Sequence, residues 1–381
     1  MSDINPEYPD VNYLRDKAKK RIPRFAFEYL DGGCNSEVNL VRNTQDIRNL
    51  KLRPNYLGPL TEVSLKTTLF GKTYDAPFGV SPIGLQGLMW PNATEILAKA
   101  SFEANIPFIL STVGTASIET VAEITEGNAW FQLYNPTDPE VRNDLFRRLE
   151  ASGIDVLVLL ADVPSFGYRS KEIRNGLSIP PKLNMRNIAQ ILSKPKWAFN
   201  TLIAGQPTFK TLTPYIPKGL SLKHLGLFMN KTFDGRLSPE IVQEIRHLWK
   251  GKLVVKGITT EEDAQKCIDY GVDGIIVSNH GGRQLDLGES AIESLRNLAP
   301  KYRSRIQIMM DSGIRNGSDI AGTLASGADF AFLGRTFMYG VSALGKKGGT
   351  HTIEILKKQL HQVMQQLDCR SISDLPDRLI K

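Results

Sequence analysis

Eight short apolar runs, separated by amphipathic stretches, constrain the fold of this chain more than any other feature. Each run is rich in Val, Ile, Leu or Phe and shows little alternation, which is typical of strands that are buried on both faces. Strands of this kind that alternate with helices predict a parallel sheet. The eight candidates are 77–81, 107–110, 130–133, 156–160, 253–255, 274–277, 307–310 and 330–333.

Helical patterns lie between these runs, and several begin with a residue that can cap a helix. The clearest patterns cover 93–104, 139–151, 239–250 and 260–270. The candidate N-caps are side chains that can accept a hydrogen bond from the first turn. They are Asn92, Ser117, Ser238 and Thr259.

The alternation fits either a closed (β/α)8 TIM barrel or an open, doubly wound sheet. The length of 381 residues is also that of one barrel with insertions, because such barrels run from roughly 200 to over 400 residues. We therefore expect one domain over 1–381. Residues 1–75 form an N-terminal extension with helical patterns and a hairpin over 65–75 that turns near Gly71.

The connection after the fourth strand candidate is unusual, because no clear helical pattern is seen before Pro239. Residues 173–233 contain no Asp or Glu but nine Lys or Arg, which exceeds the net charge of +7 for the whole chain. The basic character therefore belongs to this insertion, which we expect to be a long loop. Lysines mixed with aromatic and aliphatic side chains suit an anionic membrane surface, although a solvated loop or an active-site lid would have a similar composition.

In a (β/α)8 barrel the chemistry gathers where the strands end at their carboxyl side. Polar residues or glycines follow all eight strand candidates. In chain order they are Pro82, Ile83 and Gly84; Ser111; Gln132 and Tyr134; Asp162; Lys256; Ser278 and His280; Asp311 and Gly313; and Gly334 and Arg335.

The most informative segment is 278–286, Ser-Asn-His-Gly-Gly-Arg-Gln-Leu-Asp. It places His280 and Arg283 on a Gly-Gly turn that allows a close approach to a ligand. A guanidinium group can bind a carboxylate with two parallel hydrogen bonds, and an imidazole can accept a proton near neutral pH. The pair predicts proton abstraction from a bound carboxylic acid.

Glycine-rich backbone follows the last two strand candidates and includes Gly313, Arg315, Gly334 and Arg335. Barrels often bind a phosphate group at this place, through backbone N–H groups and a helix N-terminus. This pattern favours the closed barrel over the open sheet. It does not by itself identify the phosphate ligand.

Together these residues resemble the FMN-dependent 2-hydroxy-acid oxidase and dehydrogenase family, which includes glycolate oxidase, L-lactate dehydrogenase and mandelate dehydrogenase. The resemblance extends over nearly the whole chain. Segment 278–286 carries it, and 131–134 and 255–257 support it. It implies FMN as the cofactor and oxidation of an L-2-hydroxy acid to the 2-keto acid, with L-lactate as the first choice of substrate.

The resemblance also implies a role for individual residues. His280 is the active-site base, and Asp162 orients it. Arg169 and Arg283 bind the substrate carboxylate with help from Tyr29, and Tyr134 contacts the hydroxyl side of the substrate. The residues implied to bind FMN are Pro82, Ile83, Gly84, Ser111, Gln132, Lys256, Ser278, Asp311, Gly313, Arg315, Gly334 and Arg335. Whether His280 takes the proton of Cα or that of the hydroxyl group stays open.

Two departures from the oxidases bear on substrate and acceptor. Val113 replaces a bulky tryptophan of glycolate oxidase, so the site should admit a larger side chain. Gly84 replaces an alanine that is common in the oxidases, and this glycine is usual in the dehydrogenase branch. The resemblance thus favours a quinone or another acceptor over oxygen. A soluble oxidase that makes hydrogen peroxide and a mandelate-type dehydrogenase are the alternatives.

The partners and location follow from the same features. We expect peripheral contact of 173–233 with the inner face of the cell membrane in a cytoplasmic enzyme, because Met1–Arg21 lacks the apolar centre of a secretory signal. The resemblance implies a homotetramer. The three cysteines match no metal-binding spacing, so no metal is expected. Nucleic acid is not expected either, because the cations gather in one insertion with many aliphatic residues.

Overall fold

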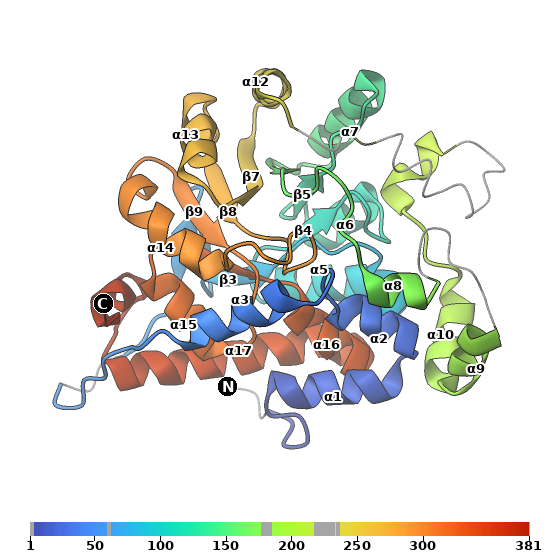
Figure 1. Ribbon diagram of the computed structural model, residues 1–381, viewed down its shortest axis with the longest axis horizontal. Helices are drawn as coiled ribbons and strands as arrows, with labels where there is room; N and C mark the ends of the chain where they lie inside the picture. Colours follow the sequence, from blue (N-terminus) through green and yellow to red (C-terminus); the bar gives the residue numbers. More distant parts are fainter. Residues whose placement is uncertain (1–3, 59–61, 177–184, 217–232, 234–236, 381) are drawn as a thin grey trace.

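The computed structural model describes residues 4–58, 62–176, 185–216, 233 and 237–380. Its centre is an eight-stranded parallel sheet with the order β3-β10-β9-β8-β7-β6-β5-β4 (Figure 1). The strands are β3 Phe78–Val80, β4 Ile109–Ser111, β5 Trp130–Leu133, β6 Val156–Leu160, β7 Lys252–Ile258, β8 Gly274–Val277, β9 Gln307–Met310 and β10 Phe330–Leu333. All eight predicted strands are confirmed.

The two ends of the sheet order meet, which makes the sheet a barrel. Val80 of β3 forms a parallel bridge with Phe108, next to β4, and its N–H donates to the carbonyl of Pro107 at 2.9 Å. The alternative of an open, doubly wound sheet is therefore excluded, and the predicted (β/α)8 barrel, here nearly closed, is confirmed. Side chains on the inner face fill the barrel, as expected for eight strands.

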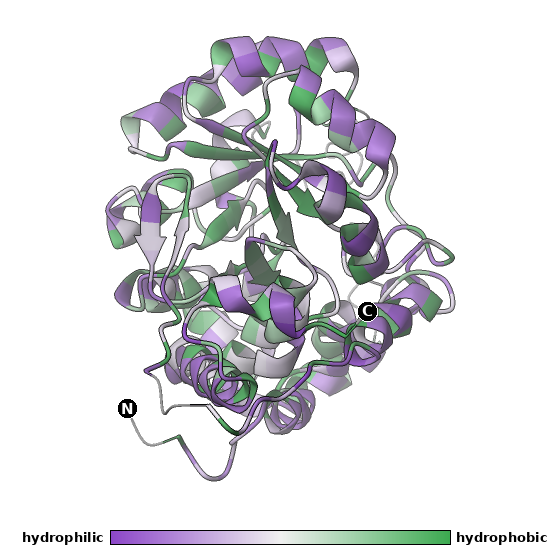
Figure 2. Ribbon diagram, turned by 90° about the vertical axis from the view of Figure 1, so that its left-hand side faces the viewer, coloured by the Kyte–Doolittle hydropathy of each residue, from purple (hydrophilic) through white to green (hydrophobic). Residues whose placement is uncertain are grey.

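Helices surround the barrel, and Figure 2 shows hydrophobic strands at the centre with mixed helix surfaces around them. The helices that follow or interleave with the strands are α4 Gln86–Met89, α5 Ala93–Glu103, α6 Ile118–Thr125, α7 Pro139–Ala151, α12 Pro239–Leu248, α13 Glu261–Asp269, α14 Ala291–Tyr302, α15 Gly317–Ala325 and α16 Arg335–Leu344. The chain ends with η2 Gly345–Lys347, α17 Gly348–Leu367 and η3 Ile372–Arg378.

Two of the four predicted N-caps are confirmed. Ser117 accepts from the N–H of Thr120, and Ser238 accepts from the N–H of Ile241. Asn92 occupies the cap position of α5 but makes no side-chain capping bond, because its backbone is left-handed (φ +55°) rather than extended. The fourth predicted N-cap, Thr259, was wrong by one residue. Strand β7 continues to Ile258, and Thr260 is the residue that accepts from the first turn of α13.

The N-terminal extension contributes α1 Val11–Arg21, α2 Arg24–Asp31, α3 Val38–Arg48 and a hairpin of β1 Thr67–Leu69 and β2 Lys72–Tyr74. The predicted turn is confirmed, and Gly71 has the positive φ (+79°) that a glycine adopts without strain. Leu69 and Tyr74 pack with Trp130, Phe330 and Phe332 of the barrel interior. The hairpin thus closes the end of the barrel from which the strands begin.

The basic insertion is more helical than the sequence indicated. It contains α8 Ser170–Arg174, α9 Met185–Leu192, α10 Pro195–Ala204 and η1 Lys210–Tyr215, so the prediction of no clear helix before Pro239 was wrong. These helices are short, and α8, α10 and η1 begin without a side-chain cap. The sequence therefore lacks the residues that usually indicate where a helix begins. Residues 177–184, 217–232 and 234–236, with Lys182, Lys218, Lys223 and Lys231, lie outside the described residues.

A buried tryptophan is one of the residues that attach the insertion to the rest of the protein. Trp197 of α10 is buried, donates from Nε1 to the carbonyl of Met89 at 3.1 Å and meets the ring of Phe25 edge-on. Helices α9 and α10 consequently lie beside α2 at the edge of the molecule (Figure 1). No helix of the described residues is long and apolar enough to cross a bilayer.

The packing of the hairpin gives a first prediction. Leu69→Ala removes a fully buried side chain from the barrel floor, so we expect the free energy of unfolding to fall by about 2–5 kcal/mol. Thr68→Ala, at the exposed position next to it, should change it by no more than about 0.5 kcal/mol. Denaturant unfolding of both variants measures the difference, and equal losses would contradict the assigned floor.

Candidate active site

A cavity of about 520 Å³ opens where the strands end at their carboxyl side. Most of the residues predicted from sequence line it. They are Tyr29, Pro82, Ile83, Gly84, Ser111, Gln132, Tyr134, Arg169, Lys256, His280, Arg283, Asp311, Gly313, Arg315, Gly334 and Arg335. The two remaining predicted residues, Asp162 and Ser278, contact lining residues from behind.

His280 follows β8 in a left-handed conformation (φ +58°), and its backbone N–H donates to the hydroxyl of Ser278 at 3.0 Å. Its Nδ1 lies 2.8 Å from Oδ1 of Asp162. Because a carboxylate only accepts hydrogen bonds, this contact assigns the proton to Nδ1 and leaves Nε2 with the lone pair. Burial lowers the pKa of His280, and the charge of Asp162 opposes that shift without reversing it. The ring is therefore neutral at pH 7 and competent as a base.

Lys256 carries a buried positive charge at the end of β7. Its Nζ lies 3.2 Å from Asp311, 3.6 Å from Asp162 and 2.6 Å from the hydroxyl of Ser278. Burial works against the charged form, but the two carboxylates outweigh it and raise the pKa of Lys256. Burial likewise acts on Asp162, whose pKa is nevertheless lowered by His280 and Lys256. The hydroxyl of Ser278 joins Lys256 to Asp162.

The two arginines predicted to bind a carboxylate lie at the other side of the cavity. Arg283 donates from Nη1 to the carbonyls of Tyr29 and Gly32 at 2.8 and 2.9 Å, and its guanidinium lies 5.1 Å from the centre of the Tyr29 ring. Arg169 donates to the amide oxygen of Gln284 at 3.3 Å. Cation–ring contacts and bonds to carbonyls hold the planar groups in place.

Sequence reasoning missed Glu172, which also lines the cavity. Its carboxylate accepts from Nη2 of Arg283 at 2.5 Å and lies 3.6 Å from Nη1 of Arg169. The available signal was its position three residues after Arg169, immediately before the acid-free stretch, because residues three apart face each other on a helix.

The part of the cavity lined by Gly313, Arg315, Gly334 and Arg335 has the character of a phosphate site. Gly313 has φ +89°, and a side chain there would collide with the backbone of Asn43. Gly334 precedes the first turn of α16 without a side-chain cap. Burial and the neighbouring guanidinium groups of Arg315 and Arg283 lower the pKa of Arg335 to about 9. Since arginine stays protonated in proteins, this shift indicates uncompensated positive charge that an anion would relieve.

The middle of the cavity offers an unpaired donor. The amide Nε2 of Gln132 is buried without a hydrogen-bond partner, while its Oε1 accepts from the hydroxyl of Ser111 at 2.7 Å. Buried donors are normally satisfied, so this atom marks a place for an acceptor on a bound group. The phosphate end, the Gln132 amide and the Lys256 charge together fit a ring cofactor that carries a phosphate.

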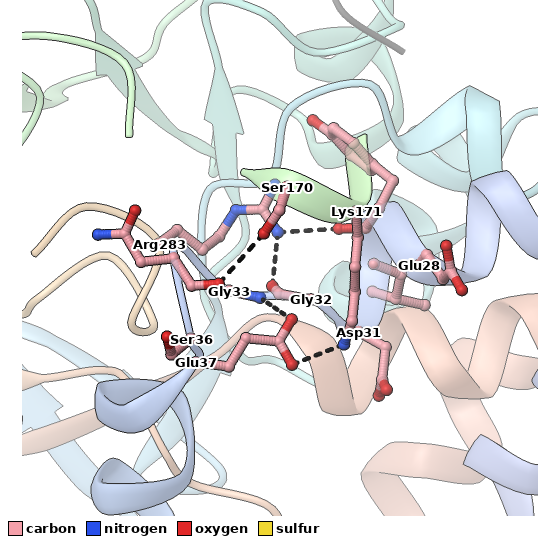
Figure 3. Close-up of polar contacts among 12 residues, drawn as sticks. Glu28, Asp31, Gly32, Gly33, Ser36, Glu37, Ser170, Lys171 and Arg283 are labelled. Carbon is pink, nitrogen blue, oxygen red and sulfur yellow. Dashed lines mark hydrogen bonds and ion pairs between the residues drawn. The ribbon is translucent and has the colours of Figure 1, made fainter. Parts of the chain in front are cut away.

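Residues 29–37 of the N-terminal extension contact both Arg283 and Arg335. The carbonyl of Gly32 accepts from Arg283 and also from Arg335 at 2.8 Å, and the carbonyl of Gly282 accepts from the N–H of Cys34. The carboxylate of Glu37 accepts from the N–H of Gly33 at 3.0 Å and from Lys171 of α8 at 2.6 Å (Figure 3). Within residues 29–37, the sequence analysis predicted a site role for Tyr29 alone.

The fold and the site define an enzyme that uses a phosphate-bearing ring cofactor to act on a small carboxylic acid. Residues 18–381 match the model of the FMN-dependent dehydrogenase family, and the chain belongs to this family. The predicted family, the FMN cofactor and the dehydrogenase class are confirmed.

Individual relatives agree with this assignment. The chain is 37% identical to a putative L-lactate dehydrogenase of Mycobacterium tuberculosis, over 97% of this chain and 88% of that protein. It is 36% identical to the L-lactate dehydrogenase of Haemophilus influenzae, over 96% of each. The crystal structure of the monotopic membrane protein (S)-mandelate dehydrogenase superposes with a TM-score of 0.93 at 33% identity, over 98% of this chain and 99% of that one. The chain is therefore an FMN-dependent 2-hydroxy-acid dehydrogenase, whereas the roles of single residues stay predictions.

The His280–Asp162 pair gives a pH prediction. A neutral base is required, so kcat/KM should fall as the pH drops through the pKa of His280, with a midpoint below the usual value of about 6.5. Asp162→Asn removes the charge that favours the imidazolium. Its acid limb should move to still lower pH while kcat falls at least about tenfold.

The pH profile of kcat/KM measures both effects. Asp286→Asn alters a carboxylate of the same segment that bonds to the N–H groups of Ser36 and Asn39, so its acid limb should stay in place. An acid limb of D162N at higher pH than that of the unmodified enzyme would contradict the assigned pair.

Proposed function

We propose that this enzyme oxidises an L-2-hydroxy acid with an apolar side chain to the 2-keto acid, with L-lactate as the first choice and a mandelate-type aryl acid as the second. The observation that supports this proposal most directly is that the neutral His280, Arg169 and Arg283 line the same cavity. The names of the L-lactate dehydrogenase relatives support the choice of substrate.

In this proposal the two guanidinium groups bind and orient the substrate carboxylate. His280 accepts one proton from the substrate at Nε2, and Asp162 stabilises the imidazolium that results. FMN, when bound, supplies the acceptor for the two electrons that leave C2 of the substrate. Lys256 is assigned to stabilise the negative charge that reduction places on the cofactor. The proton from Cα and the proton from the hydroxyl group both fit this arrangement.

The apolar side of the cavity supports a substrate larger than glycolate. Leu85, Val113, Tyr134 and Phe209 line it, and they pack as one hydrophobic cluster with Phe233. An apolar substrate side chain gains free energy by leaving water for such a surface, about 0.8 kcal/mol per buried CH₂ group. Glycolate has no side chain to place there.

The test is anaerobic reduction of the purified flavoprotein. L-lactate or L-mandelate should bleach the flavin absorbance, and glycolate should do so more slowly. His280→Gln should retain FMN and slow the bleaching by at least about 10²-fold, the low end for loss of a general base. His247→Gln, at an exposed position of α12, should leave the rate unchanged. Lack of bleaching by all three acids would remove the proposed function.

The electron acceptor and the location form a second part of the proposal, which is peripheral contact with a membrane and transfer to a quinone. Helices α9 and α10 present large apolar side chains to solvent, among them Met185 (81% exposed), Leu202 (81%) and Ile203 (70%). Lys194 and Lys196 lie at the start of α10. Apolar groups that enter the interface and cations that attract anionic lipid are the two features of a monotopic surface. The solved mandelate dehydrogenase is described as a monotopic membrane protein.

A membrane-bound enzyme has direct access to lipid-soluble quinones, which supports a quinone over oxygen. Gly84 supports the same choice, because the resemblance associates a glycine at this position with the dehydrogenase branch. The soluble oxidase remains the alternative, and hydrogen peroxide formation during turnover would favour it. The inner face of the membrane and the homotetramer stay predictions.

Liposome binding tests the surface. The double variant Leu202→Asp with Ile203→Asp should lose binding to vesicles of phosphatidylglycerol and phosphatidylcholine while keeping FMN. Tyr13→Asp with Val41→Asp introduces the same charge at two exposed apolar positions of α1 and α3 and should bind like the unmodified protein. Equal binding by both double variants would contradict the assigned surface.

A further inference from the structure

The guanidinium pair of the substrate end already contains one carboxylate of the chain. Glu172 accepts from Arg283 at 2.5 Å and lies 3.6 Å from Arg169, and all three side chains are about 15% exposed or less. At this burial the charges act in a medium of lower dielectric constant than water, so each counts strongly in what the site can bind.

The charges at this end leave room for one further anion. Two guanidinium groups and one carboxylate give a net charge of +1. Burial and the neighbouring Arg169 lower the pKa of Arg283, and Glu172 opposes this shift. Glu172 therefore offsets the mutual repulsion of the two cations. If it were absent, the pair would carry a charge of +2 with nothing nearby to balance it.

Arg335 lies close to the pair, because it donates to the same Gly32 carbonyl as Arg283, but it is assigned to the phosphate of FMN. The other titratable groups facing the pair do not change this balance. Tyr29 has its pKa raised by burial, so it is neutral, and Tyr134 shifts in the same direction for the same reason. His280 is neutral. Asp311 lines the cavity but pairs with Lys256. Among the described residues that line the cavity, Glu172 supplies the negative charge at the substrate end.

One donor of the pair is still available. Nε of Arg169 is buried and has no hydrogen-bond partner, although Nη1 and Nη2 of the same group face Glu172 and Gln284. A buried donor without a partner destabilises the site unless a ligand satisfies it. A single incoming carboxylate can bond to this atom while Glu172 keeps its bond to Arg283.

We propose that Glu172 is a specificity-determining residue that restricts the site to acids with one carboxylate. A monocarboxylate brings the substrate end to neutrality. With Arg335 assigned to the phosphate of FMN, a second carboxylate would meet the charge of Glu172 with no further cation assigned to balance it. This inference rests on the proposed function, because it assigns the same two arginines to the substrate carboxylate.

Binding of unreactive acids to the FMN-loaded enzyme tests it. Propionate and malonate differ by one carboxylate, and titration of the flavin absorbance gives the dissociation constant of each. Because Coulomb energy scales with the charge of the ligand, Glu172→Gln should strengthen malonate binding by at least about tenfold and propionate binding by about the square root of that factor. Glu172→Asp keeps the charge, so its ratio of malonate to propionate affinity should stay within about twofold of the unmodified value.

Glu244→Gln is the matched control. It removes the same charge from a carboxylate that pairs with Arg142 and does not line the cavity, so both dissociation constants should stay within about twofold. If E172Q fails to bind FMN, Glu172→Ala serves as the neutral variant. A purely structural role for Glu172 would weaken both acids together or leave their ratio unchanged, and either result overturns the inference.

Failure of the inference and failure of the proposed function give different results. An unmodified enzyme whose flavin is not reduced by any hydroxy acid contradicts the proposed function. An unmodified enzyme that is reduced and binds propionate, with no change of the malonate ratio in E172Q, contradicts only the role of Glu172.

Discussion

Lys256 carries a buried positive charge at one end of a barrel, Arg283 and Arg335 carry partly buried ones, and burying an unpaired charge costs several kcal/mol. The rest of the site can be understood from how each charge is compensated. Lys256 has two carboxylates beside it, and Arg283 has Glu172. Arg335 donates to the carbonyls of Leu30 and Gly32, and among the described residues no salt bridge pairs it, although the charge of Asp31 acts on it from a distance. The charge that is least compensated lies where the phosphate of FMN is assigned, so the site favours an anion there.

Helix α2 makes this arrangement possible. The carbonyls near its C-terminal end accept from Arg283 and Arg335, and the negative end of a helix dipole favours cations in the same place. One helix end therefore orients an arginine of the substrate side and an arginine of the phosphate side. This explains why the N-terminal extension belongs to the site although it precedes the first barrel strand.

The insertion after β6 has two faces with different physical character. Ile173 and Phe209 near its described ends line the cavity, and Trp197 anchors α10 against Met89 and Phe25. The outer side carries exposed apolar residues and lysines. In sequence this segment is a uniformly basic stretch. Its short helices separate the residues that pack on the barrel from the apolar residues and lysines that face solvent.

The sequence by itself determined the eight strands, their parallel order around a barrel and most of the cavity lining. Strands buried on both faces have a recognisable composition, and the carboxyl ends of barrel strands converge at one place. Only the tertiary structure decided which residues compensate which charge. Glu172 joins arginines that are 114 positions apart in the chain, at 169 and 283, and the carbonyls of α2 reach both ends of the site. Backbone carbonyls have no sequence signature, and a carboxylate reveals its partner only when the fold brings them together.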